Sequence, residues 1–165
     1  MKTIFLIRHA KSSWDNQQIE DHERTLNKRG LSDAPRMGEK LNMLYPAPEK
    51  IICSTAIRAK ETASLMKDRW FPLVKIDYTR QLYESPTSGI LTLIQSIPTQ
   101  INSIALFFHN PTVTHLASVL GSISIMEMPT CSAVILTSEQ EDWQSIEVGS
   151  CKLVDFEYPN KIVQN

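Results

Sequence analysis

Short apolar runs alternate along this chain with segments that are apolar on one side only. Six segments have the continuous or alternating apolar pattern of strands: 3–7, 50–53, 73–78, 101–108, 133–137 and 143–148. Four segments repeat apolar residues at the i, i+3, i+4 spacing of helices: 30–44, 56–69, 87–97 and 111–120. The run at 101–108 is apolar throughout, which is typical of a central strand covered on both faces.

The order of these segments indicates the fold class. Strand and helix alternate as far as residue 120, and the last two strands are expected to pair around a turn at 138–142. We therefore predict an α/β fold of three layers, with a mostly parallel twisted sheet, helices on both faces and a late antiparallel edge. Ser54 or Thr55, Thr87 and Asn110 are the expected helix caps, and Pro35 is expected near the first turn of its helix.

Length, composition and charge narrow the class of protein. The 165 residues, 42% of them apolar, are expected to form one soluble domain over residues 1–165. The net charge of −1 provides no basic field for nucleic acid, and no apolar segment is long enough to act as a secretory signal or cross a membrane. Three cysteines without CxxC spacing favour a reducing, cytoplasmic location. The oligomeric state is left open.

Cationic and imidazole side chains follow three of the predicted strands. Strand 3–7 ends in Arg8-His9, Arg58 stands one turn into the helix after strand 50–53, and His109 follows strand 101–108. Because the carboxyl ends of neighbouring parallel strands lie at one sheet edge, we expect two arginines and two histidines to converge there.

Such a cluster suits phosphoryl transfer. Guanidinium groups donate forked hydrogen bonds to phosphoryl oxygens, one histidine can attack phosphorus, and the other can donate to an equatorial oxygen. The nucleophilic ring must be neutral, a form that nearby positive charge favours, and its second nitrogen needs an acceptor such as a backbone carbonyl. This chemistry needs no metal or other cofactor, and the sequence contains no carboxylate cage for one.

Four ordered segments resemble one known family. Residues 6–12 (LIRHAKS) look like the RHG signature of the histidine phosphatase (phosphoglycerate mutase-like) superfamily, with Ala10 where many members have glycine. Residues 54–63 and 108–111 are similar to its S-x-x-x-R-A-x-x-T-A and G-H-N-P segments. Residues 21–38 resemble the short SixA-type phosphohistidine phosphatase branch, and the likeness extends to about residue 156.

The resemblance implies a role for each matched residue. His9 would be the phosphorylated nucleophile, and Arg8, Arg58 and His109 would form the phosphate pocket. Glu84, after the third strand, is the candidate general acid. Further candidate ligands of the substrate are the polar residues nearby: Ser12, Ser13, His22, Arg24 and Asn110. Phe108 and Thr112 replace common glycines of the family and are expected to crowd the pocket wall.

The preferred interpretation is a metal-independent phosphatase acting on protein phosphohistidine through a phosphohistidine intermediate. Only 25 positions separate Glu84 from His109, which leaves no room for a lid insertion and favours an open pocket. A phosphomonoesterase for small phosphorylated metabolites, a mutase and a non-catalytic phosphate-recognition module remain alternatives. A metal-assisted hydrolase using His9, His22, His109 and His115 is disfavoured, because no HxH or HExxH spacing occurs.

Overall fold

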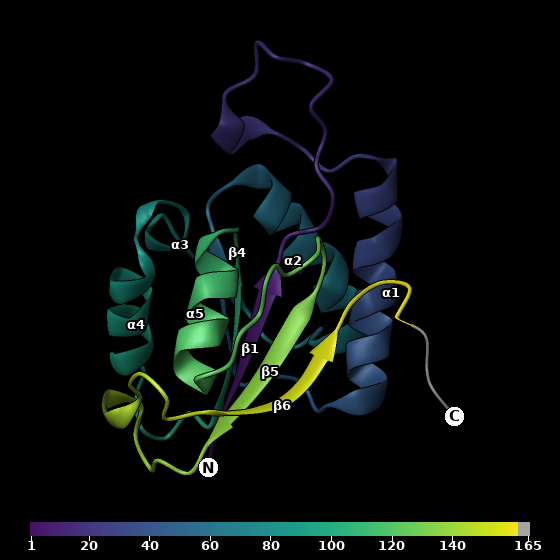
Figure 1. Ribbon diagram of the computed structural model, residues 1–165. Helices are drawn as coiled ribbons and strands as arrows, with labels where there is room; N and C mark the ends of the chain where they lie inside the picture. The colour runs from purple at the N-terminus through teal and green to yellow at the C-terminus, as the bar shows by residue number, and fades with distance from the viewer. Residues whose placement is uncertain (162–165) are drawn as a thin grey trace.

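A six-stranded sheet forms the centre of the protein, whose computed structural model describes residues 1–161 (Figure 1). The strands are β1 (Lys2–Arg8), β2 (Lys50–Ser54), β3 (Ile76–Thr79), β4 (Ser103–Phe108), β5 (Ala133–Ser138) and β6 (Lys152–Glu157). Their order is β3-β2-β4-β1-β5-β6, with the first four parallel to one another and the last two joined antiparallel. This arrangement confirms the predicted fold class, including the antiparallel edge.

Helices cover both faces of this sheet. They are α1 (Lys28–Leu44), α2 (Ile57–Trp70), α3 (Gln81–Glu84), α4 (Thr87–Gln95) and α5 (Thr112–Gly121), with short 3-10 turns η1 (Asp21–Glu23) and η2 (Trp143–Ser145). Figure 1 shows α1 and α2 on one side of the sheet and α4 and α5 on the other. Within residues 1–161, no helix combines the length and the hydropathy needed to cross a bilayer.

Two hydrophobic cores follow from the period-two alternation of the strands. On β1, Ile4 and Leu6 pack into the core under α4 and α5, whereas Phe5 and Ile7 pack into the core under α1 and α2. Both faces of the strand are thus buried, which explains its continuous apolar run. A strand held on both sides gives the residues that follow it a fixed position.

Helix α1 begins two residues before the expected Gly30. The Asn27 side chain accepts the Gly30 N–H at 2.9 Å and so caps the helix. Pro35 consequently lies inside the helix rather than in its first turn. Gly30 allows a close approach, because a Cβ there would lie 2.2 Å from the carbonyl oxygen of Lys11 in the loop after β1.

The late strand prediction is half right. Residues 133–137 fall within β5, but residues 143–148 are not a strand, and β6 comes later. Trp143 is instead buried in the core, where its indole Nε1 donates to the Ile101 carbonyl at 2.7 Å. The chain then turns through Gly149, which has a φ of +75°, before β6 begins.

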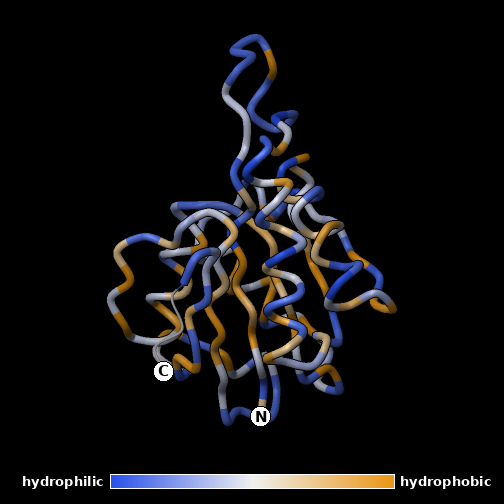
Figure 2. Tube along the Cα trace, turned by 90° about the vertical axis from the view of Figure 1, so that its right-hand side faces the viewer, coloured by the Kyte–Doolittle hydropathy of each residue, from blue (hydrophilic) through white to orange (hydrophobic). Residues whose placement is uncertain are grey.

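The segment between β1 and α1 projects from the carboxyl edge of the parallel strands (Figure 1). Its base is closed by backbone hydrogen bonds from Ser13 N to Thr25 O (2.9 Å) and from Asn27 N to Lys11 O (3.0 Å). Figure 2 shows that the projection is hydrophilic along most of its length. Its base adds Ala10 and Leu26 to the core under α1 and α2, and the rest forms a polar wall beside the strand ends.

Candidate active site

The carboxyl ends of β1, β2 and β4 meet, because the three strands are parallel neighbours and Arg8 lies in register with Phe108. They border a pocket of about 330 Å³. The pocket is lined by residues at the ends of β1 and β4, from the projecting segment, from α2 and from the loop before β5: Arg8, His9, Lys11, Ser12, Trp14, Asp21, Arg24, Arg58, His109, Asn110 and Thr130. The structure thus brings together the four residues predicted to form the centre of the site.

The His9 ring is held in a single tautomer. Its Nδ1 lies 2.7 Å from the Ala10 carbonyl oxygen, which can only accept, so Nδ1 carries the proton. Its Nε2 lies 3.3 Å from the Arg58 Nε–H, which can only donate, so Nε2 presents a lone pair. The backbone carbonyl expected as the acceptor is therefore that of the next residue.

The pKa of His9 is lowered to about 3. Burial is the main cause, since the residue is only 6% exposed, and the positive charges of Arg58, Arg8 and Arg24 act in the same direction. The hydrogen bond to the Ala10 carbonyl opposes this shift. The ring is therefore neutral at physiological pH, more through desolvation than through the neighbouring cations that the sequence suggested.

His109 lies beside His9, with 5.2 Å between the ring centroids, and its pKa is lowered to about 2, chiefly by burial. The Ser54 hydroxyl is 2.7 Å from its Nε2 and also accepts the Ala56 N–H. The hydroxyl can donate its proton to Nε2, and in that arrangement the proton of the neutral ring lies on Nδ1. Within residues 1–161, this buried Nδ1 has no hydrogen-bond partner.

Terminal guanidinium nitrogens of both arginines are bound to acceptors of the protein itself. Arg58 donates from Nη1 to the Asp21 carbonyl (2.6 Å) and from Nη2 to the Asp21 carboxylate (3.0 Å), which leaves Nε facing His9. Arg8 donates from Nη1 to the Met128 carbonyl (2.8 Å) and pairs with Glu127 at 3.7 Å. The buried Nε of Arg8 has no acceptor among the described residues.

Asp21, Trp14 and Arg24 form the outer wall of the pocket. The Asp21 carboxylate accepts from Arg24 Nε at 3.1 Å, and the Arg24 guanidinium lies 3.6 Å from the centre of the Trp14 ring. Arg24 also donates to Ser12 Oγ at 2.5 Å. Sequence reasoning missed Asp21, although its i, i+3 spacing to Arg24 in a polar segment was the available signal.

The remaining predicted site residues divide into two groups. Ser12, Arg24 and Asn110 line the pocket, whereas Ser13 and His22 do not. His22 donates to or accepts from Thr55 Oγ1 at 2.8 Å. Asn110 is not a helix cap, because its amide donates to the Met128 carbonyl at 3.1 Å and α5 begins after Pro111 without a side-chain cap.

Glu84 lies at the end of α3, a short helix that the sequence did not predict. Its carboxylate pairs with Arg80 four residues earlier, its side chain is 56% exposed, and it does not line the pocket. The structure therefore does not bring Glu84 to His9.

The expected crowding by Phe108 and Thr112 does not occur. Phe108 is fully buried in the core with Val113 and Leu116, because it shares the strand face of Ile104 and Leu106. Thr112 is the first residue of α5, and neither residue lines the pocket.

The four histidines occupy three separate environments. Only His9 and His109 share the pocket, while His22 contacts Thr55 and His115 bonds with Thr87 Oγ1 at 2.7 Å. In the part of the chain that the structure describes, no group of three or more His, Cys, Asp or Glu side chains is placed to hold a metal ion.

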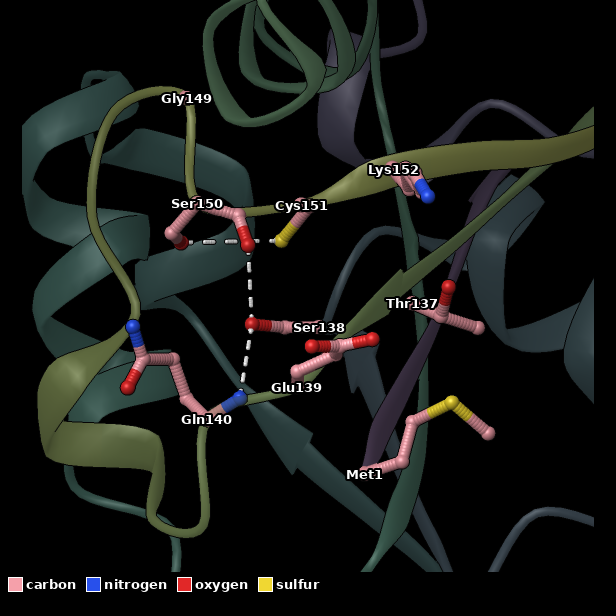
Figure 3. A pocket seen from close by; sticks show the side chains of 9 residues that line it. All are labelled: Met1, Thr137, Ser138, Glu139, Gln140, Gly149, Ser150, Cys151 and Lys152. Atoms are coloured by element: carbon pink, nitrogen blue, oxygen red, sulfur yellow. Dashed lines mark hydrogen bonds between the residues drawn. The ribbon is translucent and has the colours of Figure 1, made fainter.

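A second hollow lies at the other end of the sheet, between Met1 and the connection from β5 to β6 (Figure 3). Its polar groups satisfy one another: Ser138 Oγ donates to the Ser150 carbonyl at 2.9 Å and accepts the Gln140 N–H at 3.3 Å. Burial raises the pKa of the Cys151 thiol there, which keeps it protonated. This hollow contains no cluster of catalytic side chains comparable to that around His9.

Comparison with known families assigns the chain to a class. Residues 4–88 match the histidine phosphatase superfamily (branch 1), and the chain belongs to this family. It is 30% identical to an uncharacterised protein of Mycobacterium leprae, over 93% of this chain and 99% of that protein. It is 29% identical to an uncharacterised chloroplastic protein of Arabidopsis thaliana, over 87% of this chain and 69% of that protein.

Solved structures share the phosphoglycerate mutase-like fold. A protein from Agrobacterium tumefaciens described as the phosphohistidine phosphatase SixA superposes with a TM-score of 0.83 at 24% identity, over 96% of this chain and 98% of that one. The protein histidine phosphatase SixA complexed with tungstate superposes with a TM-score of 0.81 at 18% identity, over 94% and 96% of the two chains. At these identities the likeness concerns the fold.

Proposed function

We propose that the protein is a metal-independent phosphatase that acts on phosphohistidine through a phosphohistidine intermediate on His9. Residues 1–165 form a single domain in this proposal, without a lid insertion, so the pocket stays open to a phosphorylated side chain of another protein. His9 Nε2 attacks phosphorus, the bond between phosphorus and the leaving group breaks, and water then hydrolyses the phosphoryl-His9 bond.

The observation that carries this proposal is the hydrogen bonding of His9. A nucleophilic imidazole needs one unprotonated nitrogen and a proton on the other, and the Ala10 carbonyl and Arg58 Nε select that tautomer. The low pKa of the ring, about 3, keeps Nε2 unprotonated throughout the physiological range. A non-catalytic phosphate-binding module would not need an imidazole held in this tautomer.

The unpartnered donors beside His9 support the same chemistry. His109 Nδ1 and Arg8 Nε are buried without acceptors among the described residues, and both side chains line the pocket. Equatorial phosphoryl oxygens would accept from them, and stabilisation of these oxygens is most of what catalysis of phosphoryl transfer requires. Arg58 adds positive charge and orients His9, while Asp21 holds its terminal nitrogens.

The protonation states of the pocket favour a phosphoramidate over a phosphate ester. Hydrolysis of an alkyl ester needs a neutral acid to protonate the leaving oxygen. Asp21 has a pKa of about 2, His109 a pKa of about 2, and Glu84 lies outside the pocket. A protonated phosphohistidine needs no such acid, because its ring leaves as neutral imidazole. The structural likeness to SixA proteins agrees with this substrate class.

A substrate panel in excess chelator tests the proposal. Wild-type protein and His9→Gln are compared on a phosphohistidine peptide, a phosphoserine peptide, a phosphotyrosine peptide and 3-phosphoglycerate. We expect the highest kcat/KM on phosphohistidine, no dependence on added metal and no activity in His9→Gln. Faster turnover of phosphoglycerate or phosphoserine than of phosphohistidine would contradict the assigned substrate class. Turnover that the chelator abolishes would contradict the metal-independent mechanism.

A further inference from the structure

The Asp21 carboxylate lies at the mouth of the pocket, among its cations. Its Oδ2 accepts from Arg58 Nη2 at 3.0 Å and from the Tyr83 hydroxyl at 2.8 Å, and its Oδ1 accepts from Arg24 Nε at 3.1 Å. These contacts come from α2, α3 and the residue after η1, so donors from three parts of the chain hold one carboxylate. A carboxylate has about four acceptor positions, and within residues 1–161 these contacts use three of them.

Asp21 remains an anion at any pH at which the protein is expected to work. Partial burial by itself raises its pKa, but the hydrogen bonds from Tyr83, Arg58 and Arg24 and the positive charge of Arg58 outweigh burial and lower the pKa to about 2. Asp21 is therefore unable to donate a proton to a leaving group. It can only accept a hydrogen bond and attract positive charge.

A fixed anion beside a phosphoryl site is unfavourable unless the substrate carries a compensating cation. The phosphoryl group would bring negative charge against the carboxylate, so Asp21 disfavours any leaving group that becomes an anion. Phosphohistidine is different, because its ring can be protonated at the nitrogen that does not bear phosphorus. That N–H is a cationic donor, and Asp21 Oδ1 has an acceptor position for it.

The position of Asp21 matches that of a leaving group. In-line displacement places the leaving atom opposite the attacking His9 Nε2, with phosphorus between them. His9 is only 6% exposed, whereas the Asp21 side chain is 49% exposed and lines the same pocket. The leaving group therefore lies on the outer, Asp21 side.

We propose that Asp21 is a specificity-determining residue, which selects a cationic imidazolium leaving group by accepting a hydrogen bond from its ring N–H. This inference rests on the proposed phosphohistidine phosphatase function. The lone pair of His9 Nε2 forms the new bond to phosphorus. The electron pair of the broken P–N bond returns to the substrate ring, which leaves as neutral imidazole with its proton on the other nitrogen. Water then adds to phosphorus as the bond to His9 breaks, and dihydrogen phosphate is released.

The test compares two leaving groups of opposite character in Asp21→Asn. The substrates are a phosphohistidine peptide and p-nitrophenyl phosphate, whose leaving oxygen becomes an anion. We expect kcat/KM to fall roughly tenfold for phosphohistidine, the scale of one partly exposed charge contact, and to rise for p-nitrophenyl phosphate. The ratio of the two constants does not depend on the fraction of active protein, so it remains informative if the variant is less stable.

The pH dependence of kcat provides a second readout. The kcat profile reports ionisations in the enzyme–substrate complex, and the carboxylate keeps the bound substrate ring protonated to higher pH. Besides the substrate ring, the charged and titratable groups that face Asp21 are Arg24, Arg58, Tyr83 and the neutral ring of His109. Arg58 has its pKa lowered by burial yet is retained as a cation by Asp21, and the pKa of Tyr83 is raised. In Asp21→Asn, the alkaline limb of kcat for phosphohistidine is expected to move to lower pH.

Matched variants separate this role from a structural one. Glu23→Gln makes the same carboxylate-to-amide change on the same 3-10 turn, at a residue that does not line the pocket. This variant should leave the ratio of the two kcat/KM values and the alkaline limb of the kcat profile unchanged. Asp21→Glu retains the charge and should retain the preference for phosphohistidine. If Asp21→Asn lowers kcat/KM equally for both substrates and leaves the alkaline limb of kcat in place, Asp21 only positions Arg58 and the inference is overturned. If wild-type protein hydrolyses p-nitrophenyl phosphate but no phosphohistidine, the proposed function fails instead.

Discussion

Acidification should destabilise the protein through two histidines that are buried in the neutral form. His9 and His109 have native pKa values of about 3 and about 2, whereas an unfolded histidine titrates near 6.5. Between these values the unfolded chain binds protons that the native state does not bind. The contribution of the two neutral histidines to the free energy of unfolding is therefore fully present above pH 6.5 and is lost progressively as the pH falls toward 3.

The size of the effect follows from the same values. At pH 5, protonation of one histidine favours the unfolded state by about 2 kcal/mol, and the two together by about 4 kcal/mol. Because single domains have unfolding free energies of about 5–15 kcal/mol, this loss is a substantial share of the total. Asp21 adds little at pH 5, since both its native and its unfolded forms are mostly ionised there.

Urea unfolding at pH 7, 6 and 5, followed by circular dichroism, measures this loss. Wild-type protein should lose about 4 kcal/mol between pH 7 and pH 5, whereas His9→Gln and His109→Gln should each lose only about 2 kcal/mol. Each glutamine keeps a hydrogen-bonding side chain but removes one titrating ring. Equal pH dependence in all three proteins would refute the reasoning, since it would mean that the native rings titrate near 6.5.

Three further variants test other parts of the structure. Arg58→Lys keeps the charge but loses the Nε contact with His9, and should lower kcat on a phosphohistidine peptide by about 10²–10³ in steady-state assays. Glu84→Gln should leave kcat/KM on that peptide unchanged, because Glu84 pairs with Arg80 outside the pocket. A large loss of kcat/KM would show instead that Glu84 acts as the general acid. Gly30→Ala should lower the unfolding free energy by about 1–3 kcal/mol in urea, through the clash with Lys11, and an unchanged value would contradict that packing.

The sequence predicts the framework of this site because the framework depends on local pattern. The buried parts of β1 and β4, residues 4–7 and 104–108, are apolar at every position, so the change to Arg8-His9 and to His109 is abrupt and visible. Once the strands are taken as parallel neighbours, their ends must lie together. The four residues that the structure brings together were identified in this way.

Contacts of single polar side chains could not be predicted in the same way. Ser54 and Asn110 have the sequence positions of helix caps, yet one bonds with His109 and the other with the Met128 carbonyl. Asp21 looks like an ordinary loop carboxylate until the fold places it on Arg58, 37 residues later in the chain. Such contacts depend on tertiary distances, on which helical or strand periodicity provides no information.

Strand β6 was missed for a related reason. Its residues Lys152 to Val154 are exposed, so it lacks a continuous apolar run. The apolar residues Trp143 and Ile146 are buried, but they belong to a segment that is not a strand. Hydrophobicity reports burial, and burial is a reliable sign of a strand only where the segment is also regular.

Direct detection of a phosphoryl group on His9 tests the central claim. Protein mixed with a phosphohistidine peptide labelled with ³²P is quenched in alkali within the first turnover and digested, and the labelled fragment is sequenced. The account predicts acid-labile, alkali-stable label on the fragment that contains His9, and none in His9→Gln. Rapid turnover by the wild-type protein with no labelled His9, or label that persists in His9→Gln, would contradict it.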